Sequence, residues 1–550
     1  MRLSRADWGK GERGYSRFVR RPPAPALAVL LVALAACSTS APPSLRTQSQ
    51  SLASDQTLRI RLLDGPRSLD PALVQDEREL AVVRQFSEPL LKPTADQRDV
   101  QPAAAESYSA SGDGLTYTFH LRGNARYADG QPVHAQDFIY AWRRLIDPRT
   151  AAPRADFFAR IVQGGEDANA LDPRHDADRI DPALAALGLQ APDDLTFVVK
   201  LSTPAAEARW IAAMPEGGPL RPEMLKAPGT NGNGPFRVSD TTKDQITLAP
   251  NNSYWGGRPT LSTIVFTFGS DAAAVTRYRA GELDLVVDPP DPLSADIVKV
   301  PELTTFWVDF NVERAPFQDS RVRQAFATAV DRQALVSDEF KGRAEAATSL
   351  VPRGMNGYHP EDGKPQETNA TAAKQQLDGL GVPRAQLTGL PMIVHDRPLD
   401  RAIAEALASQ WSKTLGVSVS IQPLNPVDYG HRLRAGDFAL AGPTGWTADY
   451  PDPRDFFDLF RSNDGNNGAR WRNARYDAVV RVADIESDET KRDALYNQAH
   501  QLLESDTPVA FLVQRWHWSL EKPYVKGAPV ISVDEWPGAS YSNLLYVAAH

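Results

Sequence analysis

Two apolar runs, LPMIV (390–394) and VSVSIQPL (417–424), lie on either side of a helical pattern. Ile403, Leu407, Trp411 and Leu415 fall on one face of a helix expected at 398–415, and Gly416 follows as its C-terminal stop. A strand, a helix and a second strand in this order favour a parallel sheet. The segment therefore predicts an α/β protein.

Similar patterns extend over the rest of the chain. The apolar spacing after Asp319, a candidate N-cap, predicts one helix over 319–337. Other helices are expected near 76–91, 135–146 and 485–504, and strands at 58–63, 115–122, 195–201, 244–249, 262–268 and 508–513. A chain of 550 residues is too long for one ordinary core, so we expect two to four lobes.

Composition narrows the function classes. With 42% hydrophobic and 23% charged residues, the chain is typical of a globular protein. Its formal charge of −9 argues against nucleic-acid binding, which usually requires a basic surface.

The single cysteine, Cys37, follows a basic segment and the apolar run ALAVLLVALAA (26–36). This order is typical of a secretory signal, and the run is shorter than the roughly 20 residues that span a bilayer. LAAC (34–37) resembles the lipobox of bacterial lipoproteins, which implies cleavage before Cys37 and lipidation of its sulfur. An ordinary signal peptide with an incidental cysteine is the alternative. We expect residues 38–54 to form a flexible tether.

Motifs of catalysis and metal binding are absent from the sequence. It contains no HExxH, P-loop, GxSxG or CxxC, and no two histidines are three or four residues apart. We therefore expect no cofactor and no metal ion.

Four aspartates recur in GWTADYPDPRDFFDLF (445–460). Asp452 is expected to cap a short helix that begins at Pro453, with Asp455 reaching back to the cap and Asp458 on the solvated side. Asp449 has no such structural role. A carboxylate beside aromatic residues needs a cationic partner, which is either a ligand's ammonium group or an internal arginine or lysine.

Several stretches together resemble the family 5 extracellular solute-binding proteins of ABC importers. The resemblance covers about 58–525. Its segments, in the order that the family has, are SLDPALVQDERELAVVRQFSEPLLK (68–92), DGLTYTFHLRGNARYADGQPVHAQDFIYAWRRLIDPRTAAP (113–153), NGNGPF (231–236), NNSYW (251–255), RYRAGELDL (277–285), APFQDSRVRQAFATAVDR (315–332) and GWTADYPDP (445–453).

The resemblance implies a two-lobed α/β periplasmic-binding-protein fold, class II-like, with hinge closure and an extra third domain. After the signal (1–36) and the tether (37–54), lobe I would be discontinuous (55–87, 193–280 and 505–550). The extra domain would be 88–192 and lobe II 281–504.

The resemblance also implies roles at matching positions. Asp449 would receive the α-ammonium of a bound peptide, and Gly445 and Thr447 would offer backbone groups to it as to an added strand. Trp446 and Tyr140 would line the pocket, although simple helix packing is the alternative for Tyr140.

Two positions depart from the family pattern. Gln75 stands where the family has a glutamate that faces the ligand. Pro443-Thr444 precede Gly445, where an oligopeptide binder carries an arginine near the ligand's C-terminus. Arg432 or Arg434 is the candidate substitute.

The function that the resemblance implies is capture of a small peptide by a monomeric, lipid-anchored, extracytoplasmic protein that loads a membrane permease. Alternative ligands within the family are nickel chelates, haem, murein peptides and sugars. A hydrolase using Asp449 and Asp452 as an acid–base pair, and a surface receptor or chaperone-like protein without transport, are the alternatives of other classes.

Overall fold

A computed structural model describes residues 51–550, apart from 270, 290–295, 359–365 and 487. The expected signal, Cys37 and most of the tether lie outside the described residues. Within the described part, no helix combines the length and the apolar character needed to cross a membrane.

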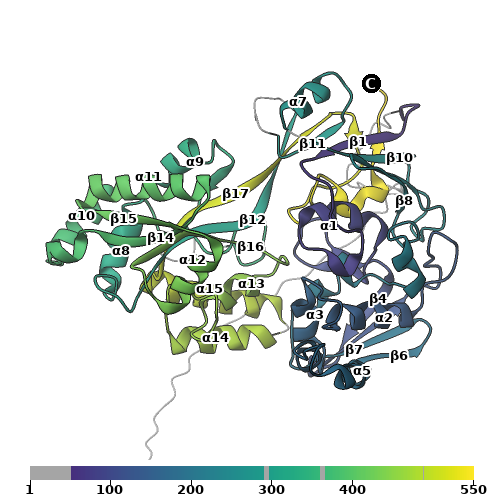
Figure 1. The fold of residues 1–550 in the computed structure, drawn as a ribbon, viewed down its shortest axis with the longest axis horizontal. Coiled ribbons are helices and arrows are strands. Elements are labelled where there is room, and N and C mark those ends of the chain that lie inside the picture. The colour runs from purple at the N-terminus through teal and green to yellow at the C-terminus, as the bar shows by residue number, and fades with distance from the viewer. Residues whose placement is uncertain (1–50, 270, 290–295, 359–365, 487) are drawn as a thin grey trace, which may run out of the picture. The chain divides into compact units, whose positions relative to one another are not determined.

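An 11-stranded mixed sheet forms the largest element of the fold (Figure 1). Its strand order is β15 (Val419–Leu424), β14 (Leu390–His395), β16 (Leu440–Thr447), β12 (Ile297–Phe310), β17 (Val509–Glu521), β11 (Leu285–Val287), β1 (Thr57–Leu62), β10 (Thr263–Phe268), β9 (Gln245–Pro250) and β8 (Phe236–Thr241), with β13 (Ala344–Ala346) paired to β17.

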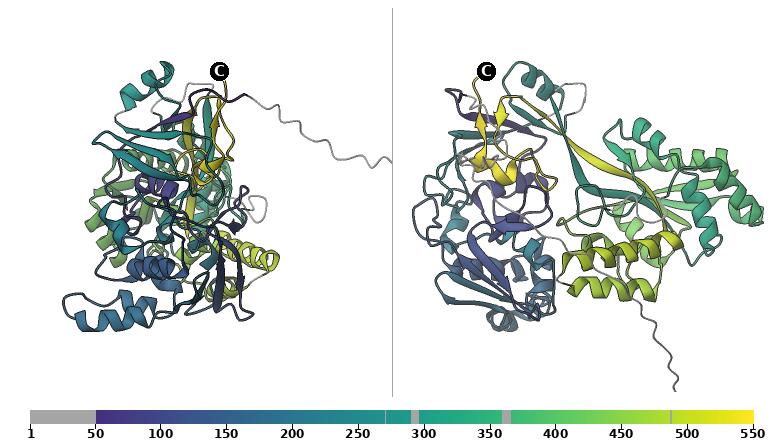
Figure 2. Two further views of the ribbon diagram at one scale, coloured as in Figure 1. Left: turned by 90° about the vertical axis from the view of Figure 1, so that its right-hand side faces the viewer. Right: turned by 180° about the vertical axis from the view of Figure 1, so that it is seen from behind.

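Strands β12 and β17 join the two ends of this sheet. They pair with each other antiparallel, while β12 also pairs with β16 and β17 also pairs with β11 (Figures 1 and 2). Helices cover each end, and separate buried cores form there: one around Phe326 and Trp411, another around Ile60 and Phe266. Two apolar cores connected by a pair of long strands are the structural basis of a two-lobed molecule.

The predicted β-α-β unit is confirmed. β14 and β15 pair in parallel, with Leu390 opposite Val419, and α11 (Pro398–Leu415) connects them. Trp411 is fully buried and its indole Nε1 donates to the carbonyl of Phe326 at 2.9 Å. Gly416 has a φ of +68°, a left-handed conformation that glycine adopts without strain, so it ends the helix as expected.

The helix predicted over 319–337 is two helices, and the single prediction was wrong. Asp319 caps α8 (Ser320–Thr328) as expected, but Asp331 then caps α9 (Arg332–Asp338) by accepting the amide of Ala334. Apolar periodicity continues through the break, which is why the sequence pattern did not reveal it.

A separate four-stranded antiparallel sheet follows the order β4 (Ala105–Ala110), β5 (Thr116–Leu121), β7 (Thr196–Lys200) and β6 (Leu189–Asp193). Helices α2 (Ala135–Ile146) and α3 (Ala155–Ile161) contribute Phe138, Trp142 and Phe158 to its fully buried core. Tyr450, which is distant in sequence, belongs to the same core and lies edge-on to Phe157. The segment after β16 is therefore anchored in this core.

The remaining elements are short connections and covering helices. They are α1 (Glu77–Phe86), β2 (Leu91–Pro93), β3 (Val100–Pro102), α4 (Gly165–Asn169), α5 (Ala177–Ala185), α6 (Ala208–Ile211), α7 (Asp271–Arg279), α10 (Ala370–Gly379), α12 (Pro426–Ala435), α13 (Arg454–Phe457), α14 (Ala474–Ile485), α15 (Glu489–Asp506), β18 (Val525–Lys526) and β19 (Tyr546–Val547).

Candidate functional site

A cavity of about 530 Å³ lies where elements from both ends of the large sheet meet. Its walls come from the start of α1, from β12 and β17 where they cross, from the end of β16 and from the 532–535 segment. The lining residues are Gln75, Asp76, Glu77, Arg78, Leu80, Arg84, Arg154, Glu302, Leu303, Thr447, Ala448, Asp449, His517, Ser532, Val533, Asp534 and Glu535. Three residues singled out from the sequence, Gln75, Thr447 and Asp449, are therefore brought together here.

Strand β16 brings Thr447 to the cavity, and Gly445 and Trp446 precede it in extended conformation. These residues pair with Thr304, Phe306 and Thr305 of β12, and the hydroxyls of Thr304 and Thr447 lie 2.7 Å apart. Within the described residues, positions 444–447 pair with β12 alone, so the other edge of β16 has no strand partner there. This edge can accept an added extended chain.

Asp449 follows this strand and has an arginine beside it. Oδ1 lies 3.6 Å from Nη2 of Arg154, whose Nε lies 3.1 Å from Oε1 of the buried Glu216. Burial raises the pKa of Asp449, and Arg154 counteracts that effect. Of the two partners left open by the sequence, the internal arginine is present, but it contacts only one oxygen and it also serves Glu216.

Asp455 holds the 446–449 segment in place. Its Oδ2 accepts both the indole Nε1 of Trp446, at 3.0 Å, and the amide of Asp449, at 2.8 Å. Burial, followed by the nearby charge of Asp449, raises the pKa of Asp455 well above its usual range. The expectation that Asp455 reaches back to the helix cap was wrong, because the helix has only four residues and its carboxylate turns toward the preceding segment.

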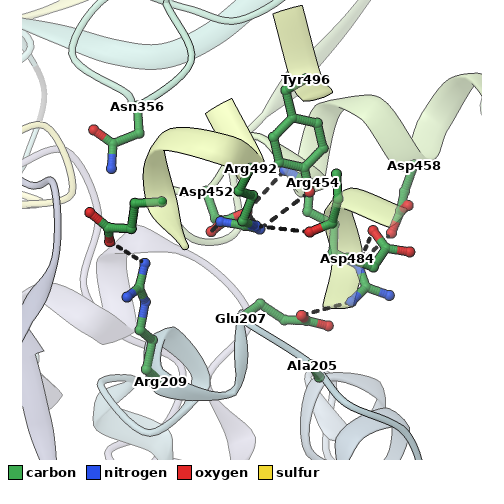
Figure 3. A network of polar contacts seen from close by, with 12 residues as sticks. Ala205, Glu207, Arg209, Asn356, Asp452, Arg454, Asp458, Asp484, Arg492 and Tyr496 are labelled. Carbon is green, nitrogen blue, oxygen red and sulfur yellow. Dashed lines mark hydrogen bonds and ion pairs between the residues drawn. The ribbon is translucent and has the colours of Figure 1, made fainter. Parts of the chain in front are cut away.

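Asp452 and Asp458 belong to a network of ion pairs (Figure 3). The expectation that Asp452 caps a helix beginning at Pro453 was wrong, because α13 begins at Arg454 and Pro453 is its N-cap. Asp452 instead accepts the amide of Arg454 at 3.0 Å and forms two bonds of 2.7 and 2.5 Å with the guanidinium of Arg492. Arg454 also contacts Glu207 at 2.7 Å and Asp458 at 3.0 Å. Asp458 is therefore bound to arginine rather than simply solvated, and Asp452 is occupied by Arg492 instead of facing Asp449 as an acid–base partner.

The other residues predicted for the site lie elsewhere. Trp446 is half-buried against the core that contains Phe456, and Gly445 is exposed on β16. Tyr140 packs against the core of the four-stranded sheet. Arg432 donates to the side chain of Gln422, at 2.6 Å, and to the carbonyl of Asp437, and Arg434 is exposed in the last turn of α12. None of these five lines the cavity.

Sequence reasoning did not single out Glu77, Arg154, His517 or Asp534, which do line it. They come from four separate segments, and no motif or local spacing relates them. Within the described residues, no cluster of three or more histidine, cysteine, aspartate or glutamate side chains is suited to hold a metal ion.

The model of the bacterial extracellular solute-binding proteins, family 5 Middle, matches residues 99–468. The chain belongs to this family. Family 5 proteins of this kind bind solutes for ABC transport and are not enzymes, which confirms the expected class.

Individual relatives cover nearly the whole chain. The probable deoxycholate-binding periplasmic protein YgiS of Escherichia coli (strain K12) is 30% identical over 91% of this chain and 95% of its own. The periplasmic oligopeptide-binding protein OppA of Salmonella typhimurium is 30% identical over 91% and 94%. The unliganded open form of the murein tripeptide-binding protein MppA superposes with a TM-score of 0.80 at 29% identity, covering 91% of this chain and 99% of that one. The fold is thus the three-domain class II binding-protein fold.

Proposed function

We propose that this family 5 protein is the extracytoplasmic substrate-binding lipoprotein of an ABC importer, and that it captures short peptides in the cavity at Asp449 and delivers them to a membrane permease. OppA of Salmonella typhimurium is named as an oligopeptide binder, and MppA as a binder of a murein tripeptide. The LAAC sequence at 34–37 supports a lipid anchor through Cys37. The domain limits stated above remain part of this proposal.

The observation that carries the proposal is the position of Asp449 beside the unpaired edge of β16. A peptide lying along this edge would form backbone hydrogen bonds with residues near Gly445 and Thr447, and its amino terminus would reach Asp449. Backbone pairing of this kind reads the length of a peptide more than its side chains.

Charge balance supports an ammonium group at this position. Asp449 and Glu216 share one guanidinium, that of Arg154, so the three groups carry an excess negative charge. A ligand ammonium would compensate that charge. Arg154 could remain in the site when the ligand binds, because it is also bound to Glu216.

The test is calorimetry of trialanine and of N-acetyl-trialanine with the mature protein and its Asp449→Asn variant. A charge-assisted hydrogen bond shielded from water contributes about 1.5–3 kcal/mol. We therefore expect acetylation, or Asp449→Asn, to weaken binding by about 10- to 150-fold. Asp178→Asn, on the exposed face of α5, is the matched control and should bind as the wild type does.

Equal affinity for the free and acetylated peptides would refute the anchor at Asp449. Binding of deoxycholate, with no binding of either peptide, would refute peptide capture. The protein would then bind the same class of ligand that YgiS is named for.

A further inference from the structure

The cavity carries an excess of carboxylates. Its lining includes six of them, Asp76, Glu77, Glu302, Asp449, Asp534 and Glu535, against three arginines, Arg78, Arg84 and Arg154. The only other titratable cation among the lining residues is His517.

All three arginines already have carboxylate partners. Arg78 pairs with Asp76, and Nη2 of Arg84 lies 2.6 Å from Oε1 of Glu535. Arg154 serves Glu216 and Asp449, as described above. An anionic ligand group would therefore find no uncommitted guanidinium on the walls of this cavity.

Glu77 and Asp534 form no ion pair with an arginine or lysine among the described residues, although burial raises the pKa of Asp534 and the nearby charge of Arg84 lowers it. Glu77 has only Nε2 of His517, at 3.8 Å from Oε1, and its side chain is 56% exposed. Oδ1 of Asp534 accepts the amide of Ser540 at 3.0 Å. Asp534 lines the cavity but is only 7% exposed. Its Oδ2 is buried and has no hydrogen-bond partner.

A structural role explains part of this arrangement. Glu77 stands in the first turn of α1, where a carboxylate is favourable to the helix dipole. The helix dipole of α1 does not explain why the Glu77 side chain lines a cavity whose walls already include Glu302 and Glu535. A cation inside the cavity would relieve the mutual repulsion of these carboxylates.

We infer that the cavity selects peptides with a second positive charge, and that Glu77 and the unpartnered oxygen of Asp534 receive a basic side chain while Asp449 receives the α-ammonium. This inference rests on the proposed function. Lysine- and arginine-containing peptides are the substrate class that it names. The same charge pattern disfavours bile acids and haem, because their carboxylates are not balanced by an ammonium group, whereas the amino terminus and the basic side chain of such a peptide outweigh its one terminal carboxylate.

The test compares tripeptides that place lysine in turn at each position of trialanine with the same peptides carrying norleucine, which keeps the aliphatic chain and removes the charge. Calorimetry on the mature protein should show at least one lysine peptide binding about tenfold more tightly than its norleucine counterpart. In Glu77→Gln and in Asp534→Asn that ratio should fall to about threefold or less, with the melting temperature measured for each variant. Glu405→Gln, on the exposed face of α11, is the matched control and should keep the full ratio.

The outcomes separate this inference from the proposed function. If lysine and norleucine peptides bind equally at all three positions, the inference is wrong and peptide capture stands. If no tripeptide binds, both are wrong. If the lysine preference survives unchanged in Glu77→Gln and Asp534→Asn, the cation is received elsewhere and the assignment of these two residues is overturned.

Discussion

The carboxyl group of Asp309 on β12 is buried and contacts β16, the strand that precedes Asp449. Its Oδ2 accepts the hydroxyl of Thr444 on β16 at 2.9 Å, and its Oδ1 accepts the indole Nε1 of Trp307 at 3.3 Å. Gly468 packs so closely that a Cβ there would lie 2.8 Å from Oδ2. Burial without a cationic partner raises the pKa of Asp309 to about 7.

The raised pKa of Asp309 predicts a pH dependence of stability. The folded protein keeps this proton up to about pH 7, whereas the unfolded chain releases it near its ordinary value of 3.8. Unfolding between these pH values therefore releases a proton, and the free energy of unfolding should fall as pH rises through this window, by at most about 1.4 kcal/mol per pH unit for one group.

Urea unfolding at several pH values from 4 to 8 would measure this slope. The raised pKa values of Glu521 and Asp534, also about 7, add to it in the wild type. Asp309→Asn should make the slope shallower by the contribution of one proton. Parallel curves for the wild type and the variant would show that Asp309 does not titrate in this range.

The candidate site shows what local sequence reveals about single residues. Asp449 stood out in the sequence because Asp452 and Asp455 could be assigned to the start of a helix and Asp449 could not. In the structure, Asp449 lines the cavity. The partner of each carboxylate could not be predicted, because Arg154 and Arg492 come from distant segments. For the same reason no local pattern pointed to Glu77 and Asp534, whose importance depends on which charges surround them.

The bounds of a helix could be predicted where its own sequence contains the residues that begin and end it. α2 and α11 begin and end at the expected residues because amphipathic spacing and a terminal glycine or cap define them locally. Strand β12 was not predicted, because Pro301 interrupts its pattern and its register shifts between Pro301 and Thr305. The strand is held by pairing with β16 and β17 on its two edges, which the local pattern does not contain.

The element that follows the site, α13, depends on the buried pair of Asp452 and Arg492. These side chains are 2% and 8% exposed, so removal of one charge leaves the other buried and uncompensated. We expect Asp452→Asn to lower the free energy of unfolding by about 3–5 kcal/mol.

Chemical denaturation measures this difference, and Asp378→Asn is its matched control. Asp378 forms an exposed pair with Lys374 on α10, so its loss should change stability by no more than about 0.5 kcal/mol. Adding Arg492→Met to Asp452→Asn should restore part of the loss, because it removes the unpaired charge. Equal effects of Asp452→Asn and Asp378→Asn would contradict the role assigned to this pair.

The overall fold was predicted by resemblance to a family rather than by local sequence pattern. The order of the quoted segments implied three domains, and the family match and the MppA superposition confirm that fold. Periodicity alone supported only an α/β protein with a parallel unit. The connection of two cores by β12 and β17 depends on pairing between segments some 200 residues apart, which periodicity cannot detect.

We propose that this molecule carries short peptides with free amino termini. Mass spectrometry of compounds released from the protein purified under native conditions would identify the ligand. We predict a series of short peptides with unmodified amino termini, enriched in lysine and arginine, and their absence from the Asp449→Asn variant purified in parallel. A bile acid, haem or a metal chelate recovered in stoichiometric amount, with no peptide, would contradict the claim.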